Sequence, residues 1–261
     1  LGHTLVRKYG GKLTLHTKFR TAIWHLTPDT SALDTLDLIT ARAEIYKHPG
    51  ALPTIKPSTI EDDLPRRDFT INAMAIRLDG DHFGEMFDHL NGQNDLEKKI
   101  IRVLHTNSFV DDPTRIFRAV RYEQRYGFKI GPFDSTQGKP DTLQLIDQES
   151  FDVLSKLSGE RIRHELDLIF EEENSAKILF RLGELGLFDS FSPKLPKLNE
   201  KYAGLLNSTP PSEFGLSATR VVLGYLLWLI DSSLEVARLI SDRLDFTAEL
   251  ADAVRAMLQL K

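Results

Sequence analysis

The sequence has 261 residues, of which 41% are hydrophobic and 27% charged, and its net charge is −5 at pH 7. This composition is typical of a folded globular protein and excludes a disordered chain, and the length suffices for one large domain or two to three small ones. The absence of cysteine excludes disulfides, thiolate nucleophiles and Cys-ligated zinc, and fits a reducing, cytoplasmic location.

The first part of the chain alternates apolar and polar residues as strands do. Lys12–His16 and Arg20–Leu26 predict two paired strands, and Leu36–Ala41 predicts a third. Residues 43–58 contain His48-Pro49-Gly50 and two further prolines, which predict a loop long enough to be functional or mobile.

The next segment, residues 66–75 (RRDFTINAMA), places two arginines and an aspartate directly before an apolar run. Phe69–Met74 predicts a helix. Residues 75–78 and 82–87 then flank Asp79-Gly80-Asp81, which predicts a β-hairpin.

From Asp112 onward the pattern is helical. Four helices are predicted, at residues 112–126, 143–157, 159–172 and 176–186. A Pro- and Ser-rich stretch near 192–212 precedes further helices from Ala218 to the end, including an apolar run at 221–230 that is too short to cross a bilayer. The fold class is therefore α+β, with an α/β part followed by an all-helical part and no membrane span.

The helix predicted after Asp111 carries an unusual row of charges. Asp112 is a good N-cap residue and Pro113 suits the first helical position. Four arginines follow at spacings of three, three and four residues and fall on one stripe about 120° wide: Arg115, Arg118, Arg121 and Arg125. Such a stripe either binds an anionic ligand such as phosphate or is neutralised by acids elsewhere in the chain, such as Glu123 or the acidic run 171–173.

Asp112 and Arg115 lie one helical turn apart, and two interpretations of the pair are open. They form a helix cap with an ion pair, or they present an acceptor and donors that read the edge of a base. The same choice applies to the Arg-Arg-Asp sequence at 66–68, where Asp68 either caps a helix that starts at Phe69 or lines a site for a charged ligand.

Three segments stand in order along the chain: residues 63–75 (DLPRRDFTINAMA), 88–96 (DHLNGQNDL) and 108–121 (SFVDDPTRIFRAVR). They resemble successive motifs of the class II tRNA nucleotidyltransferases, which are the CCA-adding enzymes and their bacterial poly(A) polymerase relatives. Residues 36–53 and 159–166 (GERIRHEL) resemble further family segments, and the match runs from about Gly10 to Pro193.

This resemblance implies a nucleotide site. Arg67 and Asp68 are expected to contact the nucleotide, Asp68 at the ribose, with Asn72 bracing that segment. Asp112 and Arg115 are expected to read CTP or ATP. Arg118 and Arg121 are expected to hold phosphates or the helix, and Asp88 and Asp95 belong to the motif that links head and neck. Asp111 stands where the family usually has Glu.

The family also implies Mg²⁺, held by an Asp-x-Asp motif that follows a Gly-Gly-x-x-Arg-Asp loop. Gly10-Gly11 is not followed by Arg-Asp, and Asp79-Gly80-Asp81 lies in a turn. We therefore expect the motif to precede Leu1, in an N-terminally truncated chain with no metal ligands of its own. Asp37, on a predicted strand, is a candidate third catalytic acid or a strand aspartate without a role, and the eight histidines show no metal-ligand spacing.

The predicted organisation has three parts: a partial nucleotidyltransferase head of the polymerase-beta-like type with a mixed sheet at 1–103, a helical nucleotide- and RNA-binding neck at 104–190, and a partial helical body at 191–261. The predicted activity is addition of CMP and AMP to the 3′ end of tRNA from CTP and ATP, with release of pyrophosphate. The window from Lys98 to Lys129 carries +5 and is expected to bind RNA backbone. The alternatives are a poly(A) or A-adding polymerase and a non-catalytic RNA-binding subunit.

Overall fold

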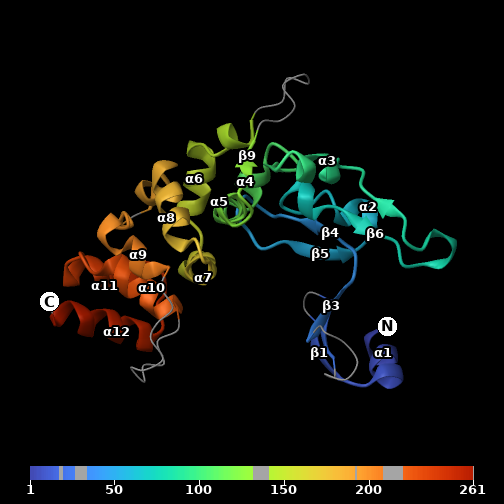
Figure 1. Cartoon of the computed structure of the whole chain (residues 1–261), viewed down its shortest axis with the longest axis horizontal. Helices are drawn as coiled ribbons and strands as arrows, with labels where there is room; N and C mark the ends of the chain where they lie inside the picture. Colours follow the sequence, from blue (N-terminus) through green and yellow to red (C-terminus); the bar gives the residue numbers. More distant parts are fainter. Residues whose placement is uncertain (18–19, 27–33, 132–140, 192, 208–219, 261) are drawn as a thin grey trace. The chain divides into compact units, whose positions relative to one another are not determined.

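The computed structural model describes residues 1–17, 20–26, 34–131, 141–191, 193–207 and 220–260 (Figure 1). The chain forms two compact units. The first unit comprises residues 1–47 and 52–67, and the second comprises residues 48–51 and 68–261. The predicted boundary at residue 103 falls inside the second unit.

The first unit is built on a three-stranded antiparallel sheet, which confirms the three predicted strands. Its strands are β1 (Lys12–His16), β2 (Thr21–His25) and β3 (Thr35–Ile39), in the order β1-β2-β3. Gly2 of helix α1 (Gly2–Tyr9) lies against the side chains of Leu13 and Leu38, so the helix packs on the sheet face that carries these two residues. Trp24 is buried on the same face and donates its indole N–H to the carbonyl of Gly10 at 3.0 Å.

The prediction of a continuous loop over residues 43–58 is wrong. Strands β4 (Arg42–Ile45) and β5 (Thr54–Pro57) pair antiparallel there, and helix α2 (Ile60–Asp63) follows. A two-stranded ribbon has only edge strands, and an edge strand tolerates a proline because one row of its backbone groups needs no partner. Pro57 is therefore the last residue of β5 and does not prevent this strand from forming.

The second unit begins with less helix than the sequence predicts. Residues Thr70–Asn72 form a single 3₁₀ turn, η2, while Phe69 is extended and bridges Val103. The predicted hairpin is confirmed in shorter form, as β6 (Ala75–Ile76) and β7 (Met86–Phe87) around the 3₁₀ turn η3 (Gly80–His82). The buried ring of Phe69 favours the extended backbone, because the bridge to Val103 carries it into the core.

Short elements connect this part to the main helices. They are α3 (Gly92–Glu97), β8 (Ile100–Ile101), α4 (Ser108–Asp111), α5 (Thr114–Tyr126) and β9 (Lys129–Ile130). The pair β8 and β9 is parallel, with α5 as part of the connection between them. Helix α5 ends at Tyr126 and is followed by Gly127, which has φ +64 and so takes the left-handed conformation common after helices.

The remaining elements are helical. They are η5 (Thr142–Leu145), α6 (Gln148–Ser155), α7 (Gly159–Phe170), α8 (Ser175–Glu184), η6 (Leu187–Ser190), η7 (Glu200–Tyr202), α9 (Ala203–Leu206), α10 (Arg220–Leu229), α11 (Leu234–Arg243) and α12 (Ala248–Gln259). This agrees with the prediction except for η7 and α9, which lie in the Pro- and Ser-rich stretch where no helix is predicted. The helix predicted at 143–157 is divided because Asp147 caps a new helix through the Ser150 amide. Ser192, residues 208–212 of the predicted Pro- and Ser-rich stretch, and Ala218 lie outside the described residues.

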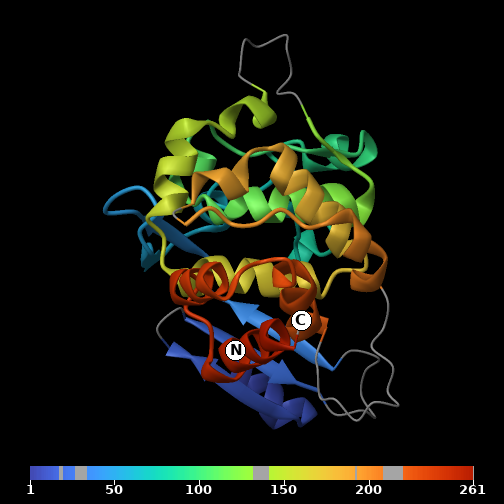
Figure 2. The same ribbon diagram turned by 90° about the vertical axis from the view of Figure 1, so that its left-hand side faces the viewer.

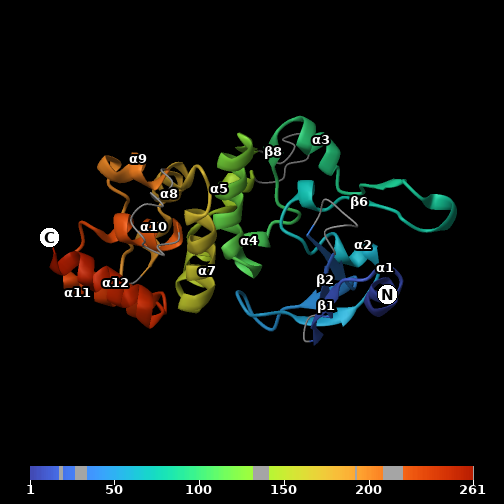
Figure 3. The same cartoon turned by 60° about the horizontal axis from the view of Figure 1, so that its bottom comes forward.

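Helix α5 lies at the centre of the second unit and contacts both α7 and α8 (Figures 2 and 3). Ile116, Phe117 and Val120 are fully buried, and they share one core with Ile162 and Leu166 of α7. This packing places the N-terminal ends of α5 and α7 beside one another, so that Arg161 of α7 reaches Asp112 just before α5. Among the described residues, no helix combines the length and apolar character needed to cross a membrane.

Candidate nucleotide site

The two arginines of the Arg-Arg-Asp sequence belong to the first unit and are both bound by Asp63. Arg67 Nη2 lies 3.0 Å from Asp63 Oδ2, and Arg66 Nη1 lies 2.7 Å from Glu44 Oε1. Burial would raise the pKa of Asp63, but hydrogen bonds from Arg66, the Arg42 amide and Arg67 outweigh it and hold this pKa below its usual value. The Arg67 side chain is 38% exposed and that of Arg66 only 17%, so Arg67 is the more accessible to a ligand.

Asp68 belongs to the second unit and is hydrogen-bonded to two other predicted site residues, Asn72 and Arg118. Its Oδ1 accepts hydrogen bonds from the Phe69 amide at 2.9 Å and from Asn72 Nδ2 at 3.0 Å, and its Oδ2 accepts from Arg118 Nε at 2.8 Å. Burial would lower the pKa of Arg118, but Asp68 outweighs it and raises that pKa. The interpretation of Asp68 as a helix cap is wrong, because η2 starts after the extended Phe69 and receives no side-chain cap.

One carboxylate oxygen of Asp112 accepts three hydrogen bonds. Its Oδ1 accepts from the Thr114 amide at 3.2 Å, from Thr114 Oγ1 at 2.7 Å and from Arg161 Nη2 at 3.0 Å. The predicted N-cap is one residue too early, because α5 begins at Thr114 with Pro113 at the N-cap position and no side-chain cap, although Asp112 does accept from the amide of Thr114. Within the described residues no hydrogen bond reaches Oδ2, and the side chain is 27% exposed. This oxygen is available to accept from a ligand.

Arg115 lies next along the same stripe of α5. Its Nη1 donates to Ser108 Oγ at 2.7 Å, and the residue is only 6% exposed, so its guanidinium is held in place. The ion-pair partner of Asp112 is therefore Arg161 and not Arg115. His105 lies near: burial, and then the charge of Arg115, lower its pKa, so this imidazole is neutral at pH 7.

The other two arginines of α5 have acidic partners within the chain. Arg121 Nη1 lies 3.2 Å from Glu165 Oε2 and its Nε lies 3.2 Å from Glu172 Oε1, while Arg125 Nε donates to Glu172 Oε2 at 3.0 Å. Burial raises the pKa of the Glu165 carboxyl against the opposing charge of Arg121. Glu172 belongs to the acidic run named from the sequence.

The two aspartates of the linking motif are structural. Asp88 accepts from the amides of Gly92 and Gln93 at 2.7 and 2.9 Å, at the start of α3. Asp95 is buried and accepts from Thr70 Oγ1 at 2.7 Å and from Arg102 Nε at 2.8 Å. These bonds tie η2 to the segment that enters the helical part.

Asp37 lies on β3, as predicted, and is exposed. The register pairs it with Ile23, so it lies on the sheet face opposite α1, together with Thr14 and His25, whose side chains are hydrogen-bonded at 3.0 Å. No group of three His, Asp or Glu side chains that could hold a metal ion occurs in the described part of the chain. The residues described here do not fit a magnesium site.

Arg161 is the residue that the sequence did not single out. The segment 159–166 was recognised as a family segment, but its spacing gave no role to any one side chain. The partners of Arg161 are Asp112 and Gly50, at separations of 49 and 111 residues, and only the fold brings them together.

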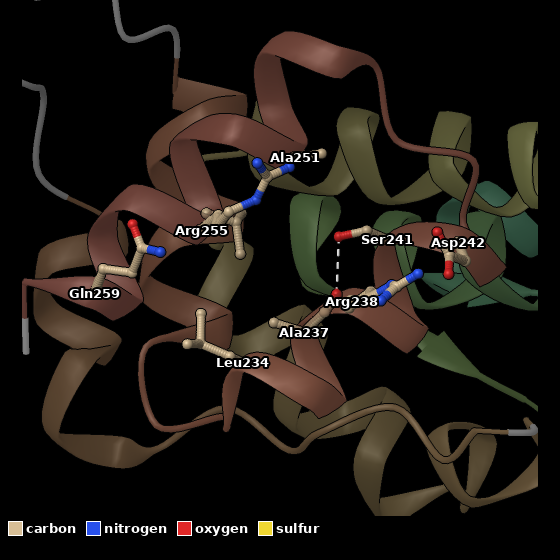
Figure 4. A pocket seen from close by; sticks show the side chains of 9 residues that line it. Leu234, Ala237, Arg238, Ser241, Asp242, Ala251, Arg255 and Gln259 are labelled. Atoms are coloured by element: carbon tan, nitrogen blue, oxygen red, sulfur yellow. Dashed lines mark hydrogen bonds between the residues drawn. The ribbon is translucent and has the colours of Figure 1, made fainter.

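A separate cleft of about 500 Å³ lies between α11 and α12 (Figure 4). Ala237 and Ala251 line it beside Arg238 and Arg255, and Ser241 Oγ donates within α11 to the carbonyl of Ala237. None of the predicted nucleotide-binding residues lines this cleft.

Two protein families match the chain. The family described as "Poly A polymerase head domain" matches residues 1–102, and the family described as "Probable RNA and SrmB- binding site of polymerase A" matches residues 139–198. The A-adding tRNA nucleotidyltransferase of Geobacter sulfurreducens is 41% identical over 193 residues, which are 74% of this chain and 21% of that protein. The A-adding enzyme of Halalkalibacterium halodurans is 41% identical over 182 residues, 69% of this chain and 40% of that protein.

Solved structures of CCA-adding enzymes also match the chain. A CCA-adding enzyme in its apo form II superposes with a TM-score of 0.78 at 35% identity, covering 98% of this chain and 59% of that one. The Thermotoga maritima CCA-adding enzyme complexed with tRNA-CCA gives a TM-score of 0.69 at 34% identity, covering 98% of this chain and 57% of that one. The chain therefore spans between about a fifth and three fifths of the length of these relatives.

Proposed function

Because the chain belongs to the tRNA nucleotidyltransferase and poly(A) polymerase family, we propose that it is part of an enzyme that adds CMP and AMP to the 3′ end of tRNA. The substrates are CTP and ATP, and pyrophosphate is released. The relative from Thermotoga maritima, solved in complex with tRNA, supports the RNA partner.

The half-satisfied carboxylate of Asp112 carries this proposal. Its Oδ2 is an acceptor open to a ligand, while Oδ1 is fixed by three donors. Cytosine and adenine both present an amino group, whereas uracil and guanine present a carbonyl oxygen at the corresponding position. One fixed acceptor therefore selects C and A together and rejects U and G, and the donors of Arg115 complete the reading of the base edge.

The other residues take supporting roles in the proposed site. Asp68, braced by Asn72, faces the ribose, and Arg67 contacts the nucleotide. Arg118 and Arg121 hold phosphates or the helix, and the bonds of Arg121 to Glu165 and Glu172 favour the second of these roles. The predicted Mg²⁺ finds no cluster of ligands among the described residues, so these roles concern binding and base choice only.

Equilibrium binding of nucleotides to this chain tests the proposal without requiring catalysis. We expect CTP and ATP to bind at least about fivefold more tightly than UTP and GTP, since a base-edge contact is worth roughly 1–3 kcal/mol. Competition against a fluorescent nucleotide measures all four. Asp242→Asn, on α11, serves as a control that leaves the order unchanged. Equal affinity for the four nucleotides contradicts the proposal.

A second activity is favoured by the relatives named as A-adding enzymes, which are 41% identical to this chain. In an A-adding enzyme the same Asp112 acceptor serves ATP alone, on tRNA that already ends in CC. Sequencing the products formed by the encoded protein on tRNA lacking A, CA or CCA separates the two activities. A-only extension identifies the A-adding reaction, and long A tails identify a poly(A) polymerase.

A further inference from the structure

The beginning of the chain carries positive charge without any acidic residue. Residues 1–28 contain five Lys or Arg and no Asp or Glu, although the whole chain has a net charge of −5. At the chain's average of 38 acidic residues in 261, a stretch of this length would contain about four. The Lys and Arg residues of this stretch that the structure describes are all exposed: Arg7, Lys8, Lys12 and Arg20. The first unit therefore presents a basic surface on an acidic protein.

These four side chains differ from most arginines of the protein in having no acidic partner. Within the described residues, no carboxylate lies at salt-bridge distance from any of them. The window from Lys98 to Lys129 is equally basic, but four of its five arginines are bound by carboxylates: Arg102, Arg118, Arg121 and Arg125. The charge of that window is thus largely neutralised within the fold, whereas the charge of residues 1–28 is open to an external anion.

Two of the charges have a local explanation. Arg7 and Lys8 lie in the last turn of α1, where positive charges interact favourably with the helix dipole. This effect does not extend to Lys12, at the start of β1, or to Arg20, which lies between β1 and β2. It also leaves the absence of acidic residues unexplained, since like charges gathered on one part of a surface repel one another. The distribution fits a surface that binds a polyanion.

An exposed aromatic ring lies among these cations. Tyr9 is 48% exposed, and its ring centroid lies 6.3 Å from that of the buried Trp24, which limits its movement on one side. Lys8 Nζ lies 5.0 Å from the centroid of the Tyr9 ring. Surfaces that bind single-stranded nucleic acid combine cations, which contact the phosphates, with aromatic rings on which bases stack. The combination favours a nucleic acid over an acidic protein, which would engage the charges alone.

Building on the proposed function, we propose that Arg7, Lys8, Tyr9 and Lys12 form an RNA-binding surface on the first unit. The cations contact phosphates of the RNA backbone, and Tyr9 stacks on a nucleotide that is not base-paired. None of these residues belongs to the proposed nucleotide site. Because phosphates carry no sequence information, the surface supplies affinity for RNA and leaves base selection unchanged.

RNA binding measured by fluorescence anisotropy tests the proposal, with labelled tRNA that lacks its CCA end as the probe. Arg7→Gln combined with Lys12→Gln removes two cations, and Tyr9→Ala removes the ring. Arg77→Gln combined with Arg255→Gln is the matched control, because it removes the same total charge from exposed arginines that already have carboxylate partners. Each titration is repeated over a range of salt concentrations, and circular dichroism establishes that each variant is folded.

Each cation that contacts a phosphate contributes about 0.7 to 0.9 to the slope of log K against log salt concentration, so the charge variant should reduce the magnitude of this slope by about 1.4 to 1.8. Tyr9→Ala should weaken RNA binding by about fivefold or more at an unchanged slope, because stacking does not release counterions. The control should keep the slope of the unaltered chain.

An unchanged slope in the folded charge variant, an unchanged affinity in folded Tyr9→Ala, or no measurable binding of the probe by the unaltered chain overturns the proposal. Vesicles containing phosphatidylglycerol separate RNA from a lipid surface: if the charge variant loses binding to the vesicles and keeps its binding to RNA, the proposal is also overturned. Nucleotide preference is measured on the same preparations. If the unaltered chain shows no preference for CTP and ATP, the proposed function fails instead, so the two failures are distinguishable.

Discussion

The two ends of helix α5 use the same residue types in opposite ways. At its start, Asp112 keeps an oxygen open and the arginine beside it, Arg115, is bound by a neutral hydroxyl. At its end, Arg121 and Arg125 are matched by the carboxylates of Glu165 and Glu172. At the first end one oxygen of Asp112 receives no hydrogen bond from the described residues, whereas the charges of the second end are paired with carboxylates of the fold.

This difference shows why a stripe of arginines does not by itself indicate a phosphate site. Ion pairs that close within the chain hold helices together, while a group that is fixed but only half-satisfied is prepared for a ligand. The end of α5 that we propose reads the base differs from the other end in what its partners leave open. Substitutions at the two ends should therefore separate stability from base choice.

The largest expected effect lies at the closed end. Arg121→Ala leaves Glu165 buried without its partner, and removing one member of a buried pair costs about 3–5 kcal/mol of unfolding free energy. Urea denaturation followed by circular dichroism measures the loss. Nucleotide preference, measured on the folded fraction at low temperature, should not change.

Arg125→Ala is the matched control for Arg121→Ala on the same helix. Its side chain is 42% exposed and Glu172 retains Arg121, so the expected cost is below about 1 kcal/mol. Equal losses in the two variants would show that burial does not distinguish the two pairs. A change of base preference in Arg121→Ala would remove the contrast between the two ends of α5.

A smaller effect, of a different kind, is expected at the open end. Asp112→Asn replaces the carboxylate with an amide that donates as well as accepts, so it can pair with the carbonyl of uracil or guanine. Preference for CTP over UTP should fall by about 1–3 kcal/mol, with little change in the urea midpoint. Isothermal titration with the four nucleotides measures it. A variant that keeps its preference while losing stability would show that Asp112 serves only to hold Thr114 and Arg161 in place.

The sequence predicted the elements whose signals are local. The three strands of the first sheet, the hairpin near Gly80 and the main helices follow from alternation, turn residues and caps that lie within a few positions of each other. The strands β4 and β5 were missed because proline argues against strands in general, and only the ribbon's lack of a second neighbour permits Pro57.

The candidate site was predicted in part, for the same physical reason. The candidate roles of Asp112 and Asp68 come from motifs in the sequence. The acidic run 171–173, which includes Glu172, was named from the sequence, but Glu165 and Arg161 were not, and they lie 44 to 111 residues from their partners Arg121, Asp112 and Gly50. No pattern along the chain encodes such pairs, because they depend on how α5 and α7 pack.

The smallest expected effect is a pH dependence of the closed end. Burial raises the pKa of Glu165 above its usual value of 4.5, with Arg121 opposing the shift. An acid with a higher pKa in the native than in the unfolded state binds more protons when folded, so its contribution to stability is complete below pH 4.5 and falls as pH rises through the native pKa. Glu165→Gln removes this titration and should flatten the decline of unfolding free energy above that pH. The Asp167 carboxyl, whose pKa burial also raises, remains in the variant and retains its part of the decline. Urea unfolding at a series of pH values measures how the unfolding free energy changes with pH in the unaltered chain and in Glu165→Gln. If the two slopes are equal, Arg121 keeps Glu165 ionised over the whole range, and burial does not raise the pKa of Glu165.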